Sequence, residues 1–127
     1  MDIKAMKTAL RKQYRSLRAA IPAEEKQQRD EKICRLILSS ASFRYAETIL
    51  AFYPKDNEVD IRPLLQETLH LGKKLALPRC EDKHIMTYRL VSSLDELVPA
   101  AFGLREPTAD APLFQECPGH SPLCLVP

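Results

Sequence analysis

Residues 47–78 decide the fold of this chain, and they read ETILAFYPKDNEVDIRPLLQETLHLGKKLALP. The segment opens on a short apolar run, residues 47–53, which is typical of a strand covered on both faces. Residues 60–71 follow with leucines on one side of a predicted helix, and Gly72 stands at its C-terminal end. Residues 74–77 form a second strand-like run. A strand, a helix and a strand in this order predict a right-handed βαβ unit with parallel strands.

Two helices are predicted ahead of this unit. The first covers residues 2–20 with Asp2 as its N-cap, and the second runs from Pro22 to about Ser39. In the first helix, apolar residues recur at spacings of three and four, which is the pattern of a buried face. The members of this apolar stripe are Ile3, Met6, Leu10, Tyr14 and Leu17. We therefore expect the first helix to bury this stripe.

Shorter segments follow the unit. Residues 85–91 alternate like a strand, residues 93–97 predict a short helix, residues 99–122 are Pro-rich and irregular, and residues 123–126 predict a last strand. The chain therefore predicts one α/β domain over residues 1–127. Its sheet is expected to be open, mainly parallel and sandwiched by helices in three layers.

Prolines follow three strand-like runs, at Pro54, Pro78 and Pro127. Proline lacks an N–H group and ends a ladder of hydrogen bonds, so these residues are expected to mark one edge of one sheet. Ligands of open α/β sheets bind beyond the carboxyl ends of the strands. The loop from Pro54 to Glu58 is therefore expected to overhang a binding crevice. A further loop of this binding crevice is expected after the last strand-like run, residues 123–127. The chain is therefore predicted to be C-terminally truncated.

Composition excludes several classes of protein. A chain of 127 residues has room for one core, and 3 Gly against 10 Pro leave too little glycine for a glycine-rich phosphate loop. No apolar stretch approaches the ~20 residues that span a bilayer, and the N-terminus lacks a signal peptide, so we expect a soluble cytoplasmic protein. Cys117, His120 and Cys124 could supply three zinc ligands where a structural site uses four, so no metal-ligating residue is assigned.

The positive charge is concentrated at the N-terminus. Residues 1–18 carry six basic side chains against Asp2, or +5, which leaves thirteen basic and sixteen acidic residues, or −3, for the rest. Lys7 and Arg11 are one helical turn apart, so both can converge on one polyphosphate. A solvated helix face is the alternative. Nucleic-acid binding is a third reading, and it is not expected because one short basic stripe on a nearly neutral chain is thin support for it.

Three further residues are candidates for ligand binding. Glu58 can accept hydrogen bonds from the N–H groups of a heterocycle, or it can favour the N-terminus of the next helix electrostatically. Tyr53 can stack on a planar ligand or pack at the sheet edge. Met86 can line a pocket or belong to the core. No histidine stands near a serine or cysteine in the manner of a catalytic triad, and no catalytic residue is assigned.

Together these segments resemble the 5-formyltetrahydrofolate cyclo-ligase family, also called methenyltetrahydrofolate synthetases. The resemblance covers essentially the whole chain and rests on five motifs in order. They are Lys7-x-x-x-Arg11, Asn57-Glu58-Val59-Asp60, Gly72-Lys73-Lys74-Leu75-Ala76-Leu77-Pro78, Met86, and Phe102-Gly103-Leu104-Arg105-Glu106-Pro107. No motif is diagnostic alone, and the specificity comes from their common order and spacing.

The resemblance implies an ATP- and Mg²⁺-dependent ring closure in folate metabolism. ATP would phosphorylate the formyl oxygen of 5-formyltetrahydrofolate, and the neighbouring folate nitrogen would then displace phosphate to give 5,10-methenyltetrahydrofolate. Residues that match Lys7 and Arg11 bind ATP phosphates in this family. Those that match Tyr53 and Glu58 hold the folate, and the one that matches Met86 lines its pocket.

The chain departs from the family at its C-terminal end. Family members continue from a strand like residues 123–127 into a glycine-rich loop with an arginine and paired tyrosines, and residues 1–127 contain no such loop. The chain is therefore expected to carry only part of the active site. The alternative is a truncated, non-catalytic nucleotide- or folate-binding domain, or an interaction domain that pairs through its last strand. The sequence does not give the oligomeric state.

Overall fold

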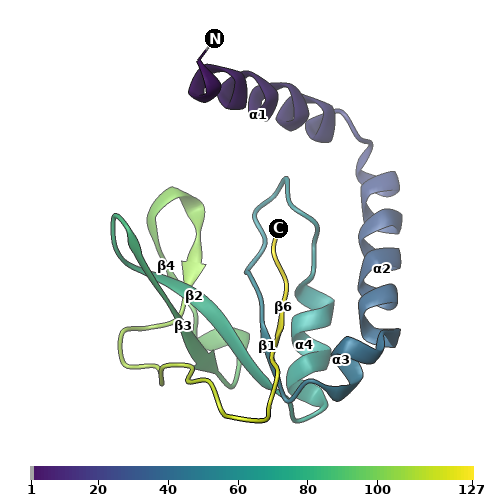
Figure 1. The fold of residues 1–127 in the computed structure, drawn as a ribbon. Coiled ribbons are helices and arrows are strands. Elements are labelled where there is room, and N and C mark those ends of the chain that lie inside the picture. The colour runs from purple at the N-terminus through teal and green to yellow at the C-terminus, as the bar shows by residue number, and fades with distance from the viewer. Residues whose placement is uncertain (1) are drawn as a thin grey trace.

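The computed structural model describes residues 2–127 (Figure 1). Its α-helices are α1 (Ile3–Ala19), α2 (Ala23–Ser39), α3 (Ala41–Tyr45) and α4 (Arg62–His70). Its main sheet is formed by β1 (Thr48–Leu50), β2 (Lys74–Asp82), β3 (Ile85–Val91) and β6 (Leu123–Cys124). A second, small pair consists of β4 (Val98–Pro99) and β5 (Arg105–Glu106), with the 3-10 helix η1 (Leu94–Glu96) before it and η2 (Ala101–Gly103) inside it. None of the described helices is both long and apolar enough to cross a membrane.

The sheet has the strand order β3-β2-β1-β6 (Figure 1). β1 pairs in parallel with β2 on one side and with β6 on the other, whereas β3 returns antiparallel to β2. Helix α4 connects β1 to β2, so the predicted βαβ unit is confirmed. The architecture is an α/β fold with a mixed, mostly parallel sheet, as the sequence predicts.

One apolar core lies between the sheet and the helices α2, α3 and α4. From the sheet it contains Ile49, Leu75 and Leu77, and from the helices Phe43 and Leu64. These five side chains are at most 2% exposed. Burying each one stabilises the fold by about 1.5–3 kcal/mol. This face of the sheet and its helical layer therefore supply most of the hydrophobic stabilisation.

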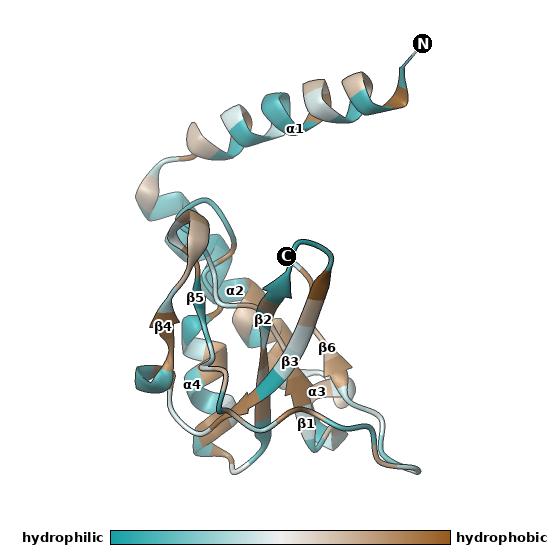
Figure 2. Ribbon diagram, turned by 90° about the vertical axis from the view of Figure 1, so that its left-hand side faces the viewer, coloured by the Kyte–Doolittle hydropathy of each residue, from teal (hydrophilic) through white to brown (hydrophobic). Residues whose placement is uncertain are grey.

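The opposite face of the sheet carries no α-helix among residues 2–127 (Figures 1 and 2). Side chains alternate across a pleated strand, so Leu90, Leu50 and Cys124, which lie in one row of the pairing register, point to this face, as does Tyr88. None of these four belongs to the core cluster. We call these four residues the open sheet face. The second helical layer of a three-layer fold stays a prediction.

Helix α1 extends away from the core (Figure 1). It begins as predicted, because Asp2 Oδ1 accepts a hydrogen bond from the Lys4 N–H group at 3.0 Å. Every residue of α1 is exposed, and the side chains of the apolar stripe range from 47% exposed at Met6 to 68% at Ile3. The expectation that this stripe is buried is therefore wrong for residues 2–127. Helical periodicity reveals an apolar face, but it does not say where the partner surface is.

Pro78 does not end its strand, contrary to the sequence expectation, because β2 continues to Asp82. The carbonyl oxygen of Tyr88, which is opposite Pro78, accepts a hydrogen bond from the Phe114 N–H group on the far side of β3. Tyr88 and Pro78 therefore do not bond to each other, and Pro78 faces the side where β1 has already ended at Leu50. Its missing N–H group leaves no partner unsatisfied there.

Two arginines of the β2–β3 hairpin hold the Pro-rich segment that follows β5. Arg79 Nη1 donates to the carbonyl oxygen of Pro107 at 2.9 Å. Arg89 Nη1 donates to the carbonyl oxygens of Ala109 and Ala111 at 3.0 and 2.8 Å. The hairpin therefore positions a segment that has almost no regular secondary structure of its own.

We expect Gly72→Ala to destabilise the protein by about 1–2 kcal/mol. Gly72 ends α4 with a φ of +76°, and its N–H group donates to the carbonyl oxygen of Leu69 at 3.0 Å. A Cβ atom at this position would meet nothing within 4 Å, so backbone strain is the whole cost. Urea unfolding measures the effect. A variant as stable as the wild type would show that residue 72 can leave the left-handed region without loss.

Candidate functional site

A cleft of about 670 Å³ opens beyond the carboxyl end of β1. Its lining comes from the end of α1, the loop after β1, the start of α4 and the turn between β4 and β5. The lining residues are Arg15, Arg18, Tyr53, Pro54, Lys55, Asp56, Asn57, Glu58, Arg62, Phe102, Gly103 and Arg105. The sequence places a binding crevice at this edge of the sheet, and the geometry agrees with that expectation.

The cleft is strongly cationic. Its lining includes four arginines and Lys55, against the carboxylates of Asp56 and Glu58. Arginine presents a planar fork of donors that matches phosphate and carboxylate groups. The arrangement therefore suits a ligand that carries several negative charges.

The loop after β1 is closed by Glu58. Its Oε1 accepts a hydrogen bond from the Lys55 N–H group at 2.8 Å, and its own N–H group donates to the Lys55 carbonyl oxygen at 3.0 Å. Glu58 therefore shapes the turn in addition to lining the cleft. This local role was not part of either sequence interpretation of Glu58.

An ion pair fixes Arg62 at the start of α4. Its Nε and Nη2 atoms each donate to a different oxygen of Asp60, both at 2.8 Å. The hydrogen bonds from Arg62 hold the pKa of Asp60 below its usual value. Asp60, and to a smaller extent Tyr53, raise the pKa of the Arg62 guanidinium. Tyr53 and Arg62 are therefore neighbours in the cleft.

Phe102 stands at the edge of the cleft in an unusual backbone conformation. Its φ and ψ are 60° and 29°, and its side chain is 89% exposed. A left-handed conformation is rare for an aromatic residue, and it costs on the order of 1–3 kcal/mol. Gly103 follows, also with positive φ. The turn between β4 and β5 thus holds a large apolar ring in solvent beside the cationic lining.

The structure brings together some of the residues predicted from the sequence. Tyr53 and Glu58 both line the cleft. Lys7 and Arg11 lie closer to the N-terminus of α1, and neither is part of the cleft lining in the described chain. Met86 lies on β3, 54% exposed, and is also outside that lining. The ligand roles of all five residues stay predictions.

Four arginines of the cleft were not assigned as site residues from the sequence. Arg15 and Arg18 belong, with Lys4, Lys7 and Arg11, to a basic stripe that the helical spacing of α1 reveals, but only Lys7 and Arg11 were assigned to a ligand. Arg62 and Arg105 come from distant segments. Only the folded chain brings them to the same cleft.

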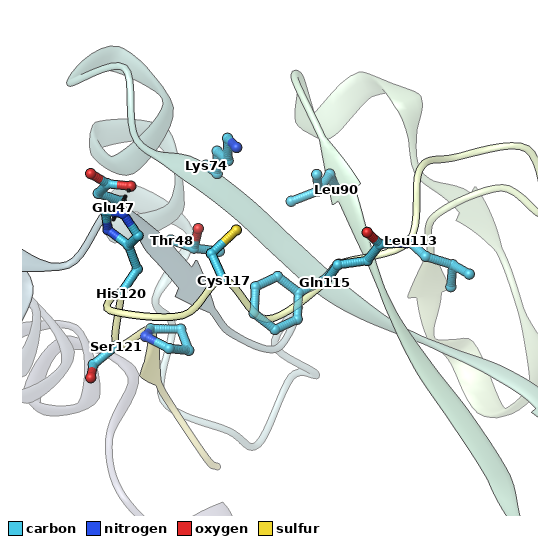
Figure 3. A pocket seen from close by; sticks show the side chains of 11 residues that line it. Glu47, Thr48, Lys74, Leu90, Leu113, Gln115, Cys117, His120 and Ser121 are labelled. Carbon is cyan, nitrogen blue, oxygen red and sulfur yellow. Dashed lines mark ion pairs between the residues drawn. The ribbon is translucent and has the colours of Figure 1, made fainter.

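A second, smaller cavity of about 230 Å³ lies at the other end of the sheet (Figure 3). Thr48 and Lys74, the first residues of β1 and β2, line it together with the segment that leads to β6. His120 Nδ1 and Glu47 Oε2 are 3.2 Å apart and connect this segment to the body. Figure 3 shows the Cys117 sulfur directed away from His120. This cavity therefore lacks a paired nucleophile and base.

The comparison with protein families matches residues 3–118 to the 5-formyltetrahydrofolate cyclo-ligase family. The chain belongs to this family. The predicted resemblance is therefore confirmed over nearly the whole chain. A search of curated proteins found no match.

Among solved structures, the fold is similar to the NMR structure of 5,10-methenyltetrahydrofolate synthetase from Aquifex aeolicus. The TM-score is 0.76 and the sequence identity 29%. The match covers 86% of this cyclo-ligase family chain and 55% of the Aquifex synthetase. The chain therefore spans about half the length of that relative.

We expect the Asp60–Arg62 pair to make stability depend on pH. The pKa of Asp60 is lowered from 3.8 in the folded state, so its contribution is present above pH 3.8 and is lost as the pH falls through the lower folded value. The variant Asp60→Asn lacks this contribution. Urea unfolding at pH 6 and pH 3 should show a smaller loss of stability on acidification for the variant. Equal losses would mean that the pair adds nothing.

Proposed function

We propose that this chain acts in the ATP-dependent cyclisation of 5-formyltetrahydrofolate to 5,10-methenyltetrahydrofolate and carries part of the active site. The observation that supports this most is the cationic cleft, because it joins four arginines to Tyr53 and Glu58 at the carboxyl edge of the sheet. Membership of the cyclo-ligase family supports a role for that cleft in this reaction. The match covers only 55% of the 5,10-methenyltetrahydrofolate synthetase, so the activity is proposed for the site as completed by further residues.

The proposed reaction transfers the γ-phosphoryl group of ATP to the formyl oxygen and releases ADP. The neighbouring folate nitrogen then attacks the formyl carbon, and phosphate leaves with the former formyl oxygen. Phosphoryl transfer needs chiefly positioning and cations opposite the phosphate oxygens. Lys7 and Arg11 are proposed to bind the phosphates, and Arg15 and Arg18 extend the same basic stripe into the cleft.

The folate is proposed to lie against the loop after β1. Tyr53 offers an aromatic ring, and Glu58 offers a carboxylate to the N–H donors of a pterin. Phe102, which is exposed beside the cleft, offers a second ring from the opposite wall. Met86 is proposed to line the pocket, and its position on β3 requires the folate to reach the β2–β3 hairpin.

Mg²⁺ would enter bound to the nucleotide. Among the described residues, no three acidic, histidine or cysteine side chains gather in the manner of a dedicated metal site. Mg²⁺ commonly takes one or two carboxylates together with substrate phosphates. Asp56 and Glu58 of the cleft fit that smaller role. When bound, the ion would neutralise the charge that develops on the phosphates.

The assay follows the methenyl product from 5-formyltetrahydrofolate with ATP present or absent. We expect the 127-residue chain to bind ATP and folate in equilibrium titrations and to turn over slowly or not at all. Fast, ATP-dependent turnover would contradict the proposal that the site is partial. Folate binding without ATP binding, and without turnover, would favour a non-catalytic folate-binding domain. Binding of neither ligand would overturn the assignment of the cleft.

We expect Glu58→Gln to weaken folate binding about tenfold or more, because hydrogen bonds to a charged group contribute about 1.5–3 kcal/mol. Glutamine keeps an oxygen acceptor for the Lys55 N–H group, so the turn is preserved. Asp56→Asn removes the same charge from the same loop and is the matched control. Titration of both variants with 5-formyltetrahydrofolate compares their affinities. Equal losses of folate affinity would show that Glu58 acts only through the general charge of the cleft.

A further inference from the structure

Glu106 is a buried carboxylate outside the lining of the cleft. It is one of three buried polar residues in the described chain, and the other two are Asp30 and Thr68. Asp30 pairs with Lys26, and Thr68 donates to the Leu64 carbonyl oxygen, so both find a partner within one turn of their own helix. Glu106, which is 8% exposed, instead bonds to a residue 26 positions away. Because burying a charge is unfavourable without polar partners, this distant contact is what holds the carboxylate in place.

Glu106 forms one half of a clasp between β5 and β2. Its Oε2 atom accepts a hydrogen bond from the Cys80 N–H group at 3.2 Å. The preceding residue of β2, Arg79, donates from Nη1 to the carbonyl oxygen of Pro107 at 2.9 Å. Two adjacent residues of β2 thus hold two adjacent residues at the end of β5, and Pro107 is fully buried there. We call these four residues the β2–β5 clasp.

The clasp occupies the edge of β2 that β1 leaves free. Cys80 is opposite Met86 and stands two residues beyond Pro78, so its N–H group points away from β3. On that side β1 has already ended at Leu50. The Cys80 N–H group therefore has no acceptor in the sheet, and an edge donor of this kind needs another partner. The Glu106 carboxylate takes the place that a carbonyl oxygen of β1 fills farther back along the strand.

The turn between β4 and β5 depends on anchors outside itself. Its ladder has only two residue pairs, and a ladder of this length is marginal on its own. The turn also holds Phe102 in the left-handed region, where an aromatic residue is rarely found. Leu97, which is 3% exposed and belongs to the core cluster, fixes the chain before the turn. The β2–β5 clasp fixes the chain after it.

The position of this anchor determines the geometry of the cleft. Successive side chains of a strand point to opposite sides, so Glu106 faces β2 while Arg105 faces the cleft. Phe102 lines the cleft from the same turn, whereas Tyr53 and Glu58 line it from the loop after β1. The spacing between these two walls of the cleft is therefore set by where the clasp holds β5.

We propose that Glu106 is a positioning residue for the proposed reaction. Its carboxylate holds β5 against the Cys80 N–H group and thereby sets where Phe102 and Arg105 meet the folate. Glu106 lies outside the cleft lining, so it acts through the turn and not by contact with a ligand. This inference rests on the proposed function, because that function places the folate between the two walls of the cleft.

The variant Glu106→Leu tests the proposal, because leucine fills the buried space but offers no acceptor to the Cys80 N–H group. We expect the Kd for 5-formyltetrahydrofolate to rise about tenfold, comparable to the loss of one aromatic contact. The Kd for ATP should change by less than about twofold, because the proposed phosphate ligands lie on α1, at a distance from the clasp. Glu106→Gln keeps an oxygen acceptor and should restore folate affinity to within about twofold of the wild type.

Thr68→Val is the matched control for these titrations. It removes a buried hydrogen bond inside α4, at a residue outside the cleft lining, and it should lower stability without changing folate affinity. Equal losses of folate and ATP affinity in Glu106→Leu, or a folate affinity that Glu106→Leu leaves unchanged, would overturn the positioning role alone. A wild-type chain that binds no folate would overturn the proposed function and this role with it.

Hydrogen exchange tests the clasp without any ligand. The Ala100 N–H group donates to the Leu104 carbonyl oxygen across the turn at 2.8 Å, and the Ala51 N–H group donates to Ala76 in the main sheet at 3.0 Å. We expect Glu106→Leu to speed exchange at Ala100 and to leave exchange at Ala51 unchanged, because only the turn is released. Equal acceleration at both amides would mean that Glu106 supports the whole fold and would contradict a specific hold on the turn.

Discussion

Phe43→Ala should destabilise the protein by about 3–5 kcal/mol, which is a large part of the ~5–15 kcal/mol that holds a domain of this kind together. Phe43 is 2% exposed and joins α3 to the core. The N–H group of Phe43 donates a hydrogen bond to Ser40 Oγ at 3.2 Å. The Lys73 ammonium lies 5.2 Å from the centroid of the Phe43 ring and donates to the carbonyl oxygens of Arg44 and Ala46. Removing the ring leaves a cavity and takes away the surface beneath Lys73.

Denaturant unfolding followed by circular dichroism measures this effect. Tyr45→Ala is the matched control, because Tyr45 is an aromatic residue of the same short helix and is 79% exposed. Its replacement should change the free energy of unfolding by less than about 0.5 kcal/mol. Similar losses for the two variants would show that α3 contributes through its own helicity and not through the buried ring.

Replacing both Arg15 and Arg18 by glutamine should raise the Kd for ATP by about 10- to 100-fold under the proposed function. Hydrogen bonds from guanidinium to phosphate are charge-assisted, and each contributes about 1.5–3 kcal/mol. Both residues line the cleft, and both lie on a helix without buried residues, so their replacement leaves the fold intact. Calorimetric titration gives the Kd, and the salt dependence of binding should become shallower.

Lys12→Gln is the control for this experiment, because Lys12 is an exposed cation of the same helix outside the cleft lining. It changes the net charge without changing the cleft. An equal loss of affinity in Lys12→Gln would mean that the overall charge of the helix attracts the nucleotide. Unchanged affinity after replacement of Arg15 and Arg18 would show that ATP binds elsewhere, for example along Lys7 and Arg11 alone.

The sequence predicts the central βαβ unit well, because its signals are local. Apolar runs, a capping glycine and leucines at helical spacing all lie within residues 47–78. The short helix α3 gives no such signal, since five residues are too few for a periodic pattern and its cap, Ser40, is also the end of α2. Pro78 was misinterpreted because its tolerance depends on where the neighbouring strand ends, which is a property of the sheet.

The candidate site was predictable only in part. Tyr53 and Glu58 follow a strand, so their place at the sheet edge can be inferred from the chain order. Arg105 and Phe102 reach the cleft through the β4–β5 turn, and that turn depends on the left-handed backbone at Phe102, which sequence patterns do not foresee. The exposure of α1 could not be predicted from its sequence either, because it depends on whether another part of the described chain packs against the apolar stripe.

The two arginines of the β2–β3 hairpin divide the molecule into parts of unequal local stability. Residues 107–111 are held mainly through their carbonyl oxygens, by side chains that belong to the hairpin. The part of this segment after the fully buried Pro107 can open without disturbing the core, whereas any opening of the hairpin releases it. Glu81, which accepts hydrogen bonds from Arg89 at 2.9 and 3.1 Å, keeps that guanidinium in place. Hydrogen exchange in this part of the chain therefore reports on the hairpin and not on the helical layer.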